Sequence, residues 1–273
     1  MNYIQSILLG LVQGLTEFLP VSSSGHLQIF KEILGADAIK ASLSLDILLH
    51  VGTLLAVFFV YYKDIWCLIR EFFCMLYDLL RGKPDFKTPY RRFVLMVIIG
   101  SIPAGILGIL FEDAIAELPL YFVGIALFVT ALLLWLSDKL ADGKRTMENA
   151  PYSSSLVVGL FQALALLPGL SRSGSTISGA RCMGYSREFA VKFSFILSIP
   201  AVLGAALLDA VDVFSGEAAG VPVLPALCGM AVAAISGFFA IRWLLHLVQK
   251  SKFYYFSYYC VAAGVAAILL YIF

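Results

Sequence analysis

The sequence predicts an all-α protein that crosses a membrane several times and is built from two related halves. Hydrophobic residues fill 61% of the 273 positions and only 14% are charged, a composition typical of lipid-embedded chains. Several apolar stretches are long enough for a helix to cross about 30 Å of hydrocarbon. A segment near the N-terminus is also repeated 149 positions later. We therefore expect a single membrane domain, residues 1–273, with repeat halves 1–149 and 150–273.

The charge balance argues against a nucleic-acid partner. Nineteen Lys and Arg residues stand against 18 Asp and Glu, which gives a net charge of +1. A protein that neutralises many phosphates along a nucleic acid carries a basic excess instead. The five cysteines form no CxxC pair and lie mostly in apolar stretches, where a free thiol behaves as a small hydrophobe. We expect neither nucleic-acid binding nor cysteine chemistry.

Six stretches predict transmembrane helices. Four of them carry almost no charge, and two contain isolated ionisable side chains, namely Asp46 and His50 in one and Lys192 in the other. Their length and apolarity favour crossing helices in all six cases. The predicted spans are residues 42–62, 93–111, 120–136, 189–208, 221–241 and 253–273. Residues 66–80 mix charged and apolar side chains at helical spacing, which predicts an amphipathic helix at the membrane surface.

Lys and Arg in the loops predict the orientation of these spans. Seven of them lie in residues 63–92, whereas the loops 112–119 and 209–220 contain none. Cytoplasmic loops are the ones that carry an excess of Lys and Arg. We therefore expect residues 63–92 inside the cell and the C-terminus outside.

The internal repeat lies in two segments that are too apolar for surface loops. Seven of the 17 positions in residues 10–26 are identical to residues 159–175 without a gap, where chance would give roughly one or two. Three predicted spans separate the copies. Because three is an odd number, the second copy enters the membrane from the opposite side. The sequence therefore predicts an inverted-topology repeat.

Each copy contains a proline break and a turn rich in serine and glycine. These turns read LPVSSSGHL in residues 19–27 and LPGLSRSGSTISG in residues 167–179. Irregular backbone at membrane depth is stable only where protein buries it or where it lines a wet cavity. We therefore expect two re-entrant helical hairpins whose tips meet near the midplane. Serine hydroxyls and N–H groups at a helix start favour an anion, and the planar fork of Arg172 suits phosphate oxygens.

Three ionisable side chains near these turns are candidates for chemistry, since charges at this depth are costly and usually functional. Glu17 follows Gln13 by four residues, so both lie on one helix face, and His26 ends the first turn. With the arginine of the second turn they could compensate one another. Each could also serve packing alone, and the serines could simply cap helices. Asp46 and His50 have no such turn beside them, which favours a supporting or packing role.

The motifs QGLTEFLPVSSSGH and PGLSRSGSTISG are similar to the two signature motifs of the bacterial undecaprenyl-diphosphate phosphatase family of the bacitracin-resistance type. The resemblance covers the whole chain in length, order of spans and placement of the motifs. It implies hydrolysis of a C55 polyprenyl diphosphate to the monophosphate carrier of cell-wall synthesis, with release of inorganic phosphate. It also implies a place in the plasma (inner) membrane, with the active site opening to the outer side.

Matching positions carry the family's site residues over to this chain. The candidate catalytic residues are Glu17, Ser23, His26 and Arg172. Ser23 is the preferred nucleophile, with His26 or Glu17 as its base, and attack by His26 or by a water that it activates stays open. The candidate phosphate-binding residues are Gln13, Ser22, Ser24, Ser171, Ser173 and Thr176. The family further implies a divalent cation, Mg²⁺ or Ca²⁺, with Glu17 as a ligand, although Gln13 removes the second carboxylate.

The expected partners are the polyprenyl diphosphate substrate and membrane lipids, and a homodimer is left open. A transporter or lipid flippase with a phosphate-binding site at the midplane is the alternative function, because inverted repeats with broken helices also build transporters. Phosphate release from a detergent-solubilised sample would separate the two functions, since no compartments remain for transport.

Overall fold

A computed structural model of the chain describes residues 2–34, 43–83, 85–116, 118–215, 222–249 and 253–272. Within these residues the chain is helical, and its one β-type contact is an isolated bridge between Arg145 and Tyr185. The helices are α1 (Tyr3–Phe18), α2 (Ser23–Leu34), α3 (Leu43–Val60), α4 (Tyr62–Leu80), α5 (Pro89–Ala116), α6 (Leu120–Asp138), α7 (Tyr152–Leu164), α8 (Arg172–Cys182), α9 (Arg187–Ser215), α10 (Val223–Gln249) and α11 (Tyr254–Ile272). The all-α prediction is confirmed.

Five helices in the described residues are long and apolar enough to cross a membrane by themselves. They are Pro89–Phe111, Leu120–Asp138, Arg187–Leu207, Val223–Val248 and Tyr254–Ile272. Each coincides with one of the predicted spans, so the chain is a multi-pass membrane protein. Three predicted spans each have one terminal residue, 42, 221 or 273, outside the described residues.

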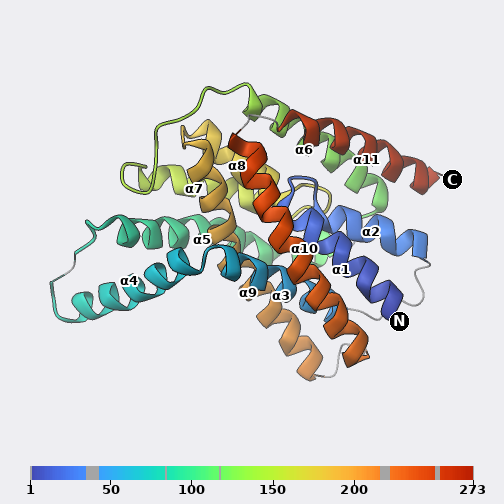
Figure 1. Cartoon of the computed structure of the whole chain (residues 1–273), viewed down its shortest axis with the longest axis horizontal. Helices are drawn as coiled ribbons and strands as arrows, with labels where there is room; N and C mark the ends of the chain where they lie inside the picture. The colour runs from blue at the N-terminus through green and yellow to red at the C-terminus, as the bar shows by residue number, and fades with distance from the viewer. Residues whose placement is uncertain are drawn as a thin grey trace.

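The sixth predicted span, residues 42–62, corresponds to α3, which ends at a sharp bend. Leu45–Val60 of α3 and the whole of α4 meet at a bend of 91°, and only together do they reach the length and apolarity of a span. The predicted surface helix, residues 66–80, is the later part of α4, which begins at Tyr62. The bend thus lies between the predicted span and the predicted surface helix, where Lys63 and Asp64 follow the apolar stretch. In Figure 1, α4 extends away from the bundle beside α5.

Pairs of glycines bring α1 against α10 and α7 against α5. A Cβ atom on Gly10 would lie 2.3 Å from the carbonyl oxygen of Gly229, and one on Gly159 would lie 2.3 Å from that of Gly100. Only glycine allows backbones to approach this closely. Helices in a membrane associate through such small residues, because lipid provides no hydrophobic force that drives them together. The two short helices α1 and α7 therefore dock on long helices in the same manner.

A third glycine contact joins α6 to α11, which run side by side in Figure 1. A Cβ atom on Gly124 would lie 2.8 Å from the carbonyl oxygen of Gly264, and one on Gly264 would lie 2.9 Å from that of Gly124. This contact is reciprocal, so the two helices use equivalent points on their surfaces. It lies apart from the contacts that hold α1 and α7.

The C-terminal end of α1 is anchored in the protein core. Phe18 is only 1% exposed, and its ring meets that of Phe195 on α9 edge-on, with 5.3 Å between the ring centroids. Tyr61, at the bend between α3 and α4, approaches the same Phe195 ring at 6.3 Å. Aromatic pairs in this geometry stabilise beyond the area that they bury. Packing of Phe18 therefore fixes the positions of Glu17 and of the serine turn that follows.

Replacing Gly10 with alanine should destabilise the protein, because the new methyl group would overlap the α10 backbone. Overpacking of this kind costs about 1–3 kcal/mol. The thermal midpoint of the detergent-solubilised protein measures it and should fall clearly below that of the wild type. Gly105→Ala in α5 is the matched control, because a Cβ atom there meets nothing within 4 Å and alanine favours a helix over glycine. Equal midpoints for the two variants would contradict the close α1–α10 contact.

Candidate active site

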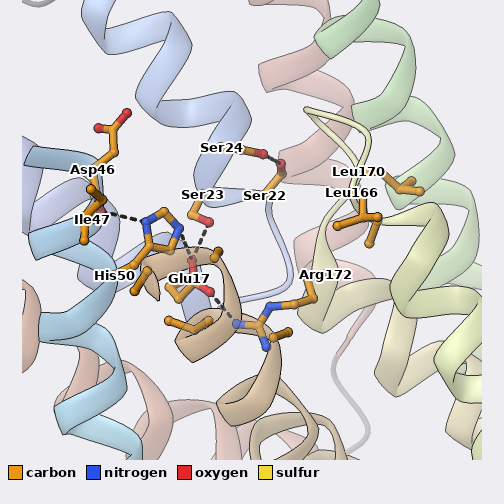
Figure 2. Close-up of a pocket in the computed structure, with 15 residues that line it drawn as sticks. Glu17, Ser22, Ser23, Ser24, Asp46, Ile47, His50, Leu166, Leu170 and Arg172 are labelled. Carbon is orange, nitrogen blue, oxygen red and sulfur yellow. Dashed lines mark hydrogen bonds and ion pairs between the residues drawn. The ribbon is translucent and has the colours of Figure 1, made fainter. Parts of the chain in front are cut away.

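A cavity of about 270 Å³ lies where α1, α2, α3 and α9 meet the turn that precedes α8. Its polar lining consists of Glu17, Ser22, Ser23, Ser24, Asp46, His50 and Arg172. The rest of the lining is apolar and comes from Ile47 of α3, from α9 and from the segment between α7 and α8. Figure 2 shows the polar side chains gathered around Glu17, with Ser23 on one side and Arg172 on the other. Segments far apart in the sequence thus converge on one carboxylate.

Glu17, in the last turn of α1, is the centre of this cluster. Its Oε2 atom accepts hydrogen bonds from Ser23 Oγ at 2.5 Å and from Gln13 Nε2 at 3.0 Å. Its Oε1 atom forms an ion pair with Arg172 Nη2. The Glu17 side chain is only 5% exposed, and a buried carboxylate needs such partners to remain charged. The serine, the amide and the guanidinium together hold it in place.

The first serine turn has a strained backbone that places its hydroxyls at the start of α2. Ser22 has a φ of 70°, a left-handed conformation that costs a residue with a side chain about 1–3 kcal/mol. Its Oγ lies 3.3 Å from Ser24 Oγ and accepts from the Gly25 N–H at 3.3 Å. α2 begins at Ser23, so the positive end of its dipole faces the cavity. Strain at this point is typical of a functional turn.

The second serine turn repeats these contacts at the start of α8. Ser171 caps the helix by accepting from the Gly174 N–H at 3.1 Å, and its Oγ lies 3.3 Å from Ser173 Oγ. Ser173 Oγ in turn donates to the Leu19 carbonyl at 3.3 Å. The two turns therefore touch, as the sequence predicted, and Arg172 projects from the second turn toward Glu17 of the first.

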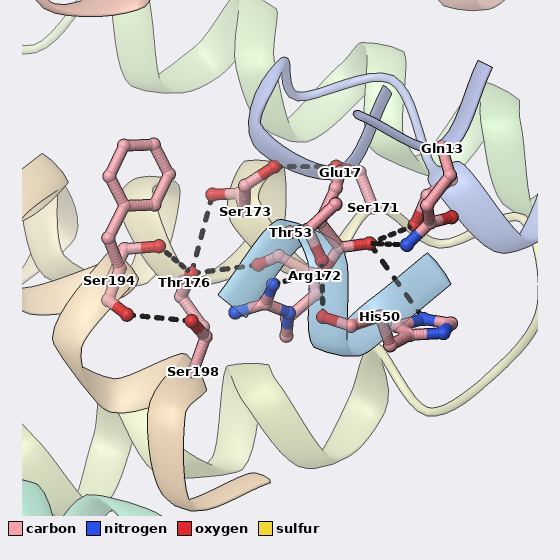
Figure 3. A network of polar contacts seen from close by, with 12 residues as sticks. Gln13, Glu17, His50, Thr53, Ser171, Arg172, Ser173, Thr176, Ser194 and Ser198 are labelled. Atoms are coloured by element: carbon pink, nitrogen blue, oxygen red, sulfur yellow. Dashed lines mark hydrogen bonds and ion pairs between the residues drawn. The ribbon is translucent and has the colours of Figure 1, made fainter. Parts of the chain in front are cut away.

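Several predicted phosphate-binding residues are buried in the protein outside the cavity lining, where they contact the turns. These residues are Gln13, Ser171, Ser173 and Thr176. Thr176 Oγ1 donates to the Arg172 carbonyl at 2.8 Å and lies 2.6 Å from Ser194 Oγ on α9. Figure 3 shows this polar network running from the site into the core. These contacts position the turns, and they leave direct phosphate contact by these four residues a prediction.

His26 points away from the cavity. Its Nδ1 donates to the Ser22 carbonyl at 2.8 Å, and its Nε2 lies 2.7 Å from the Tyr259 hydroxyl. The imidazole also stacks on the Tyr259 ring at 5.5 Å between centroids. Both nitrogens are therefore engaged. Of the two bases that the sequence left open for Ser23, it is Glu17 that Ser23 contacts.

Asp46 and His50, given a supporting role by the sequence, both line the cavity. His50 Nε2 lies 3.9 Å from Glu17 Oε2. Asp46 Oδ2 is paired with Lys31 Nζ of α2 at 2.5 Å. The signal that points to them in the sequence is an ionisable pair four residues apart in an otherwise apolar helix, because such groups in a membrane helix are functional candidates.

The donor set around Glu17 offers no all-protein cage for a Mg²⁺ or Ca²⁺ ion. Ca²⁺ takes six to eight oxygen ligands, whereas Mg²⁺ takes six, with one or two carboxylates and the rest from waters and substrate phosphates. Both Glu17 oxygens are already bound by hydrogen-bond donors and by the Arg172 cation. The described part of the chain contains no group of three or more His, Cys, Asp or Glu side chains placed to hold a metal. A cation here would take most of its ligands from water and from the substrate phosphates, so the predicted cation stays a prediction.

Comparison with known proteins places the chain in a family. Residues 6–266 match the model of the family described as bacitracin resistance protein BacA. A protein of Alkaliphilus metalliredigens named undecaprenyl-diphosphatase is 45% identical, and the alignment covers 98% of each chain. Undecaprenyl-diphosphatase of Methanosphaera stadtmanae is 40% identical and undecaprenyl-diphosphatase 3 of Bacillus cereus is 37% identical, each over 99% of this chain and 98% of the relative. The chain belongs to the BacA bacitracin resistance family.

Proposed function

We propose that the chain is a membrane-embedded hydrolase that converts undecaprenyl diphosphate to undecaprenyl phosphate and inorganic phosphate. The names of its full-length relatives support this substrate. The observation that carries the proposal is the Ser23 hydroxyl, which donates to the buried Glu17 carboxylate beside Arg172. A hydroxyl with a base and a nearby cation is what phosphoryl transfer to a serine needs.

Ser23 is the nucleophile in this proposal. Its Oγ attacks the terminal phosphorus, and Glu17 Oε2 takes the hydroxyl proton across the 2.5 Å hydrogen bond. The bond from the terminal phosphorus to the bridging oxygen breaks, and undecaprenyl phosphate leaves. Water then hydrolyses the phosphoserine and restores the hydroxyl. An unassisted serine is a weak nucleophile at neutral pH, so the contact with Glu17 is the activating feature.

Arg172 is suited to hold the terminal phosphate. One of its nitrogens, Nη2, pairs with Glu17, while Nη1 has no hydrogen-bond partner among the described residues although it is buried. A buried donor without a partner is costly, and a phosphate oxygen would satisfy it. The fork can thus bridge carboxylate and phosphate. The N-terminus of α2 adds positive potential on the side of Ser23.

We also propose that the two halves form an inverted repeat in which α1–α2 and α7–α8 are re-entrant hairpins. Matching pairs of serine hydroxyls, each 3.3 Å apart, support the equivalence of the two turns. The glycine contacts of α1 with α10 and of α7 with α5 support it as well. α1 and α7 are 16 and 13 residues long, shorter than the roughly 20 that cross a membrane, which agrees with hairpins that enter and return.

The cavity fits a site that opens to the outer side of the plasma membrane. Asp46, in its lining, lies in the first turn of α3, and the α9 lining residues lie in the second half of that helix. The loop after α9 lacks Lys and Arg, whereas the basic segment 63–92 follows the opposite end of α3. Under the positive-inside rule, the cavity therefore faces outward.

A transporter or lipid flippase would also use turns that meet inside a membrane domain. It would bind a phosphate with Arg172 and the helix N-termini alone. A serine held on a carboxylate base serves bond breaking and has no place in simple passage, so Ser23 favours the enzyme. Phosphate release by the purified protein in detergent separates the two functions.

Ser23→Ala should lower kcat for phosphate release by about 10³-fold or more, whereas loss of one phosphate hydrogen bond alone costs nearer 10²-fold. Ser24→Ala is the matched control, because Ser24 lies in the same turn but contacts Ser22 rather than Glu17. Steady-state kinetics in detergent measure both variants. Should folded Ser23→Ala keep more than about a tenth of the wild-type kcat while His26→Ala is inactive, attack by histidine, or by a water that it activates, replaces the serine route.

Arg172→Lys should lower turnover by about 10²-fold or more, because one ammonium group cannot hold Glu17 and a phosphate oxygen in the geometry of a guanidinium. Arg145→Lys is the control, since Arg145 is an exposed arginine that binds the Met183 carbonyl away from the cavity. The same phosphate assay measures both. Near-normal turnover by a folded Arg172→Lys protein would remove Arg172 from the site.

A further inference from the structure

The second step of the serine route releases a proton from the attacking water, and that route names no group to accept it. The inference below rests on the proposed serine route. After the first step Glu17 carries the proton of Ser23. When the bond from phosphorus to Ser23 Oγ breaks, Glu17 has to return that proton to the departing oxygen, which lies 2.5 Å away. The attacking water must also lose a proton as it bonds to phosphorus. A second base in the cavity would accept this proton as the new bond forms.

His50 is placed to be that base. Its Nδ1 lies 2.8 Å from the carbonyl oxygen of Asp46, and a carbonyl only accepts, so Nδ1 carries a proton. In a neutral ring Nε2 is then the free acceptor. Nε2 is the atom that lies 3.9 Å from Glu17 Oε2, the oxygen that also binds Ser23. The backbone of α3 thus selects the tautomer that presents a base to the reacting atoms.

The side chains of His50 and Glu17 differ in solvent exposure, which suits them to different proton transfers. The His50 side chain is 36% exposed, whereas that of Glu17 is 5% exposed. His50 can therefore meet a water that enters the cavity, and Glu17 is restricted to the serine that covers it. The two groups share a cavity without competing for one proton.

The other charged or titratable groups near His50 have partners of their own. Asp46, on the same helix, pairs its Oδ2 atom with Lys31 of α2, while its Oδ1 atom has no hydrogen-bond partner among the described residues. Arg172 of α8 is a cation bound to Glu17. His26 has both ring nitrogens engaged and lies outside the cavity lining. Among the described residues lining the cavity, His50 is thus the group with a free basic nitrogen.

We propose that His50 is the general base of the second half-reaction. Its Nε2 takes a proton from the attacking water while the water oxygen bonds to the phosphorus of phosphoserine. The bond from phosphorus to Ser23 Oγ breaks, Glu17 returns its proton to that oxygen, and inorganic phosphate forms. His50 then gives its proton to the phosphate as it leaves or to solvent. Both bases end in their starting states.

His50→Gln tests the proposal, because glutamine retains a polar side chain of similar reach but cannot take a proton. The purified full-length variant is mixed with undecaprenyl diphosphate that is radiolabelled in its terminal phosphate, quenched in acid and counted for label on the protein. We expect about one label per chain within the first turnover. Release of inorganic phosphate should then be slower by about 10²-fold or more than in the wild type.

Two matched variants define the specificity of this effect. His246→Gln changes an exposed histidine of α10 and should leave label and release unchanged. Asp46→Asn removes the cavity carboxylate that pairs with Lys31 and should not accumulate label. Wild-type phosphate release by His50→Gln overturns the proposal, and so does slow release with no label on the protein while Ser23→Ala is inactive. Full activity of Ser23→Ala would instead overturn the serine route itself.

Chemical rescue gives a second readout that does not depend on one substitution. His50→Ala opens a space next to an exposed part of the cavity, and added imidazole should enter it and restore phosphate release by at least several fold. The same imidazole should not rescue Ser23→Ala. A folded His50→Ala protein that accumulates no label and gains nothing from imidazole contradicts the assignment.

Discussion

The buried carboxylate of Glu17 is the interaction on which the rest of the site depends. A charge placed inside a membrane protein is costly unless other groups neutralise it and saturate it with hydrogen bonds. Arg172 supplies the opposite charge, and Ser23 and Gln13 supply the hydrogen bonds. Because these groups come from α1, the first turn and the second turn, satisfying one carboxylate requires the two turns to meet. The contacts that neutralise Glu17 are therefore also contacts that hold the two turns together.

The proposed repeat supplies a symmetric frame for asymmetric chemistry. The two turns share their serine contacts, and α1 and α7 share the manner in which they dock. A shift of 149 residues nevertheless places Ser23 on Arg172 and Glu17 on Leu166. The first half therefore contributes the proposed nucleophile and its proposed base, and the second contributes the Arg172 cation and an apolar wall of the cavity. Two turns of similar backbone can hold different side chains at one site, because the helix after each turn begins beside the cavity.

The sequence predicted the features that depend on the composition of a short segment, namely the apolar spans and the polar turns. Five spans followed from apolar length, and the grouping of Glu17 with Arg172 followed from two polar turns in an apolar chain. The bend at Tyr61 lies between the predicted span and the predicted surface helix, but its angle of 91° could not be predicted, because an apolar pattern gives the extent of a helix and not its direction. The orientation of the histidines could not be predicted either. His26 turns toward Tyr259, which is 233 residues away in the sequence, and His50 enters the cavity through the packing of α3 on its neighbours.

Single-turnover phosphate release by Glu17→Gln tests the central role of this carboxylate most directly. Glutamine retains the size of the side chain and a hydrogen bond to Ser23, but it can neither take a proton nor pair with Arg172. If Glu17 is the base, the folded variant should form phosphoserine and release phosphate about 10³-fold more slowly than the wild type, or slower still. A folded Glu17→Gln protein that reacts within about tenfold of the wild-type rate would contradict this role, because a charged base would then be unnecessary.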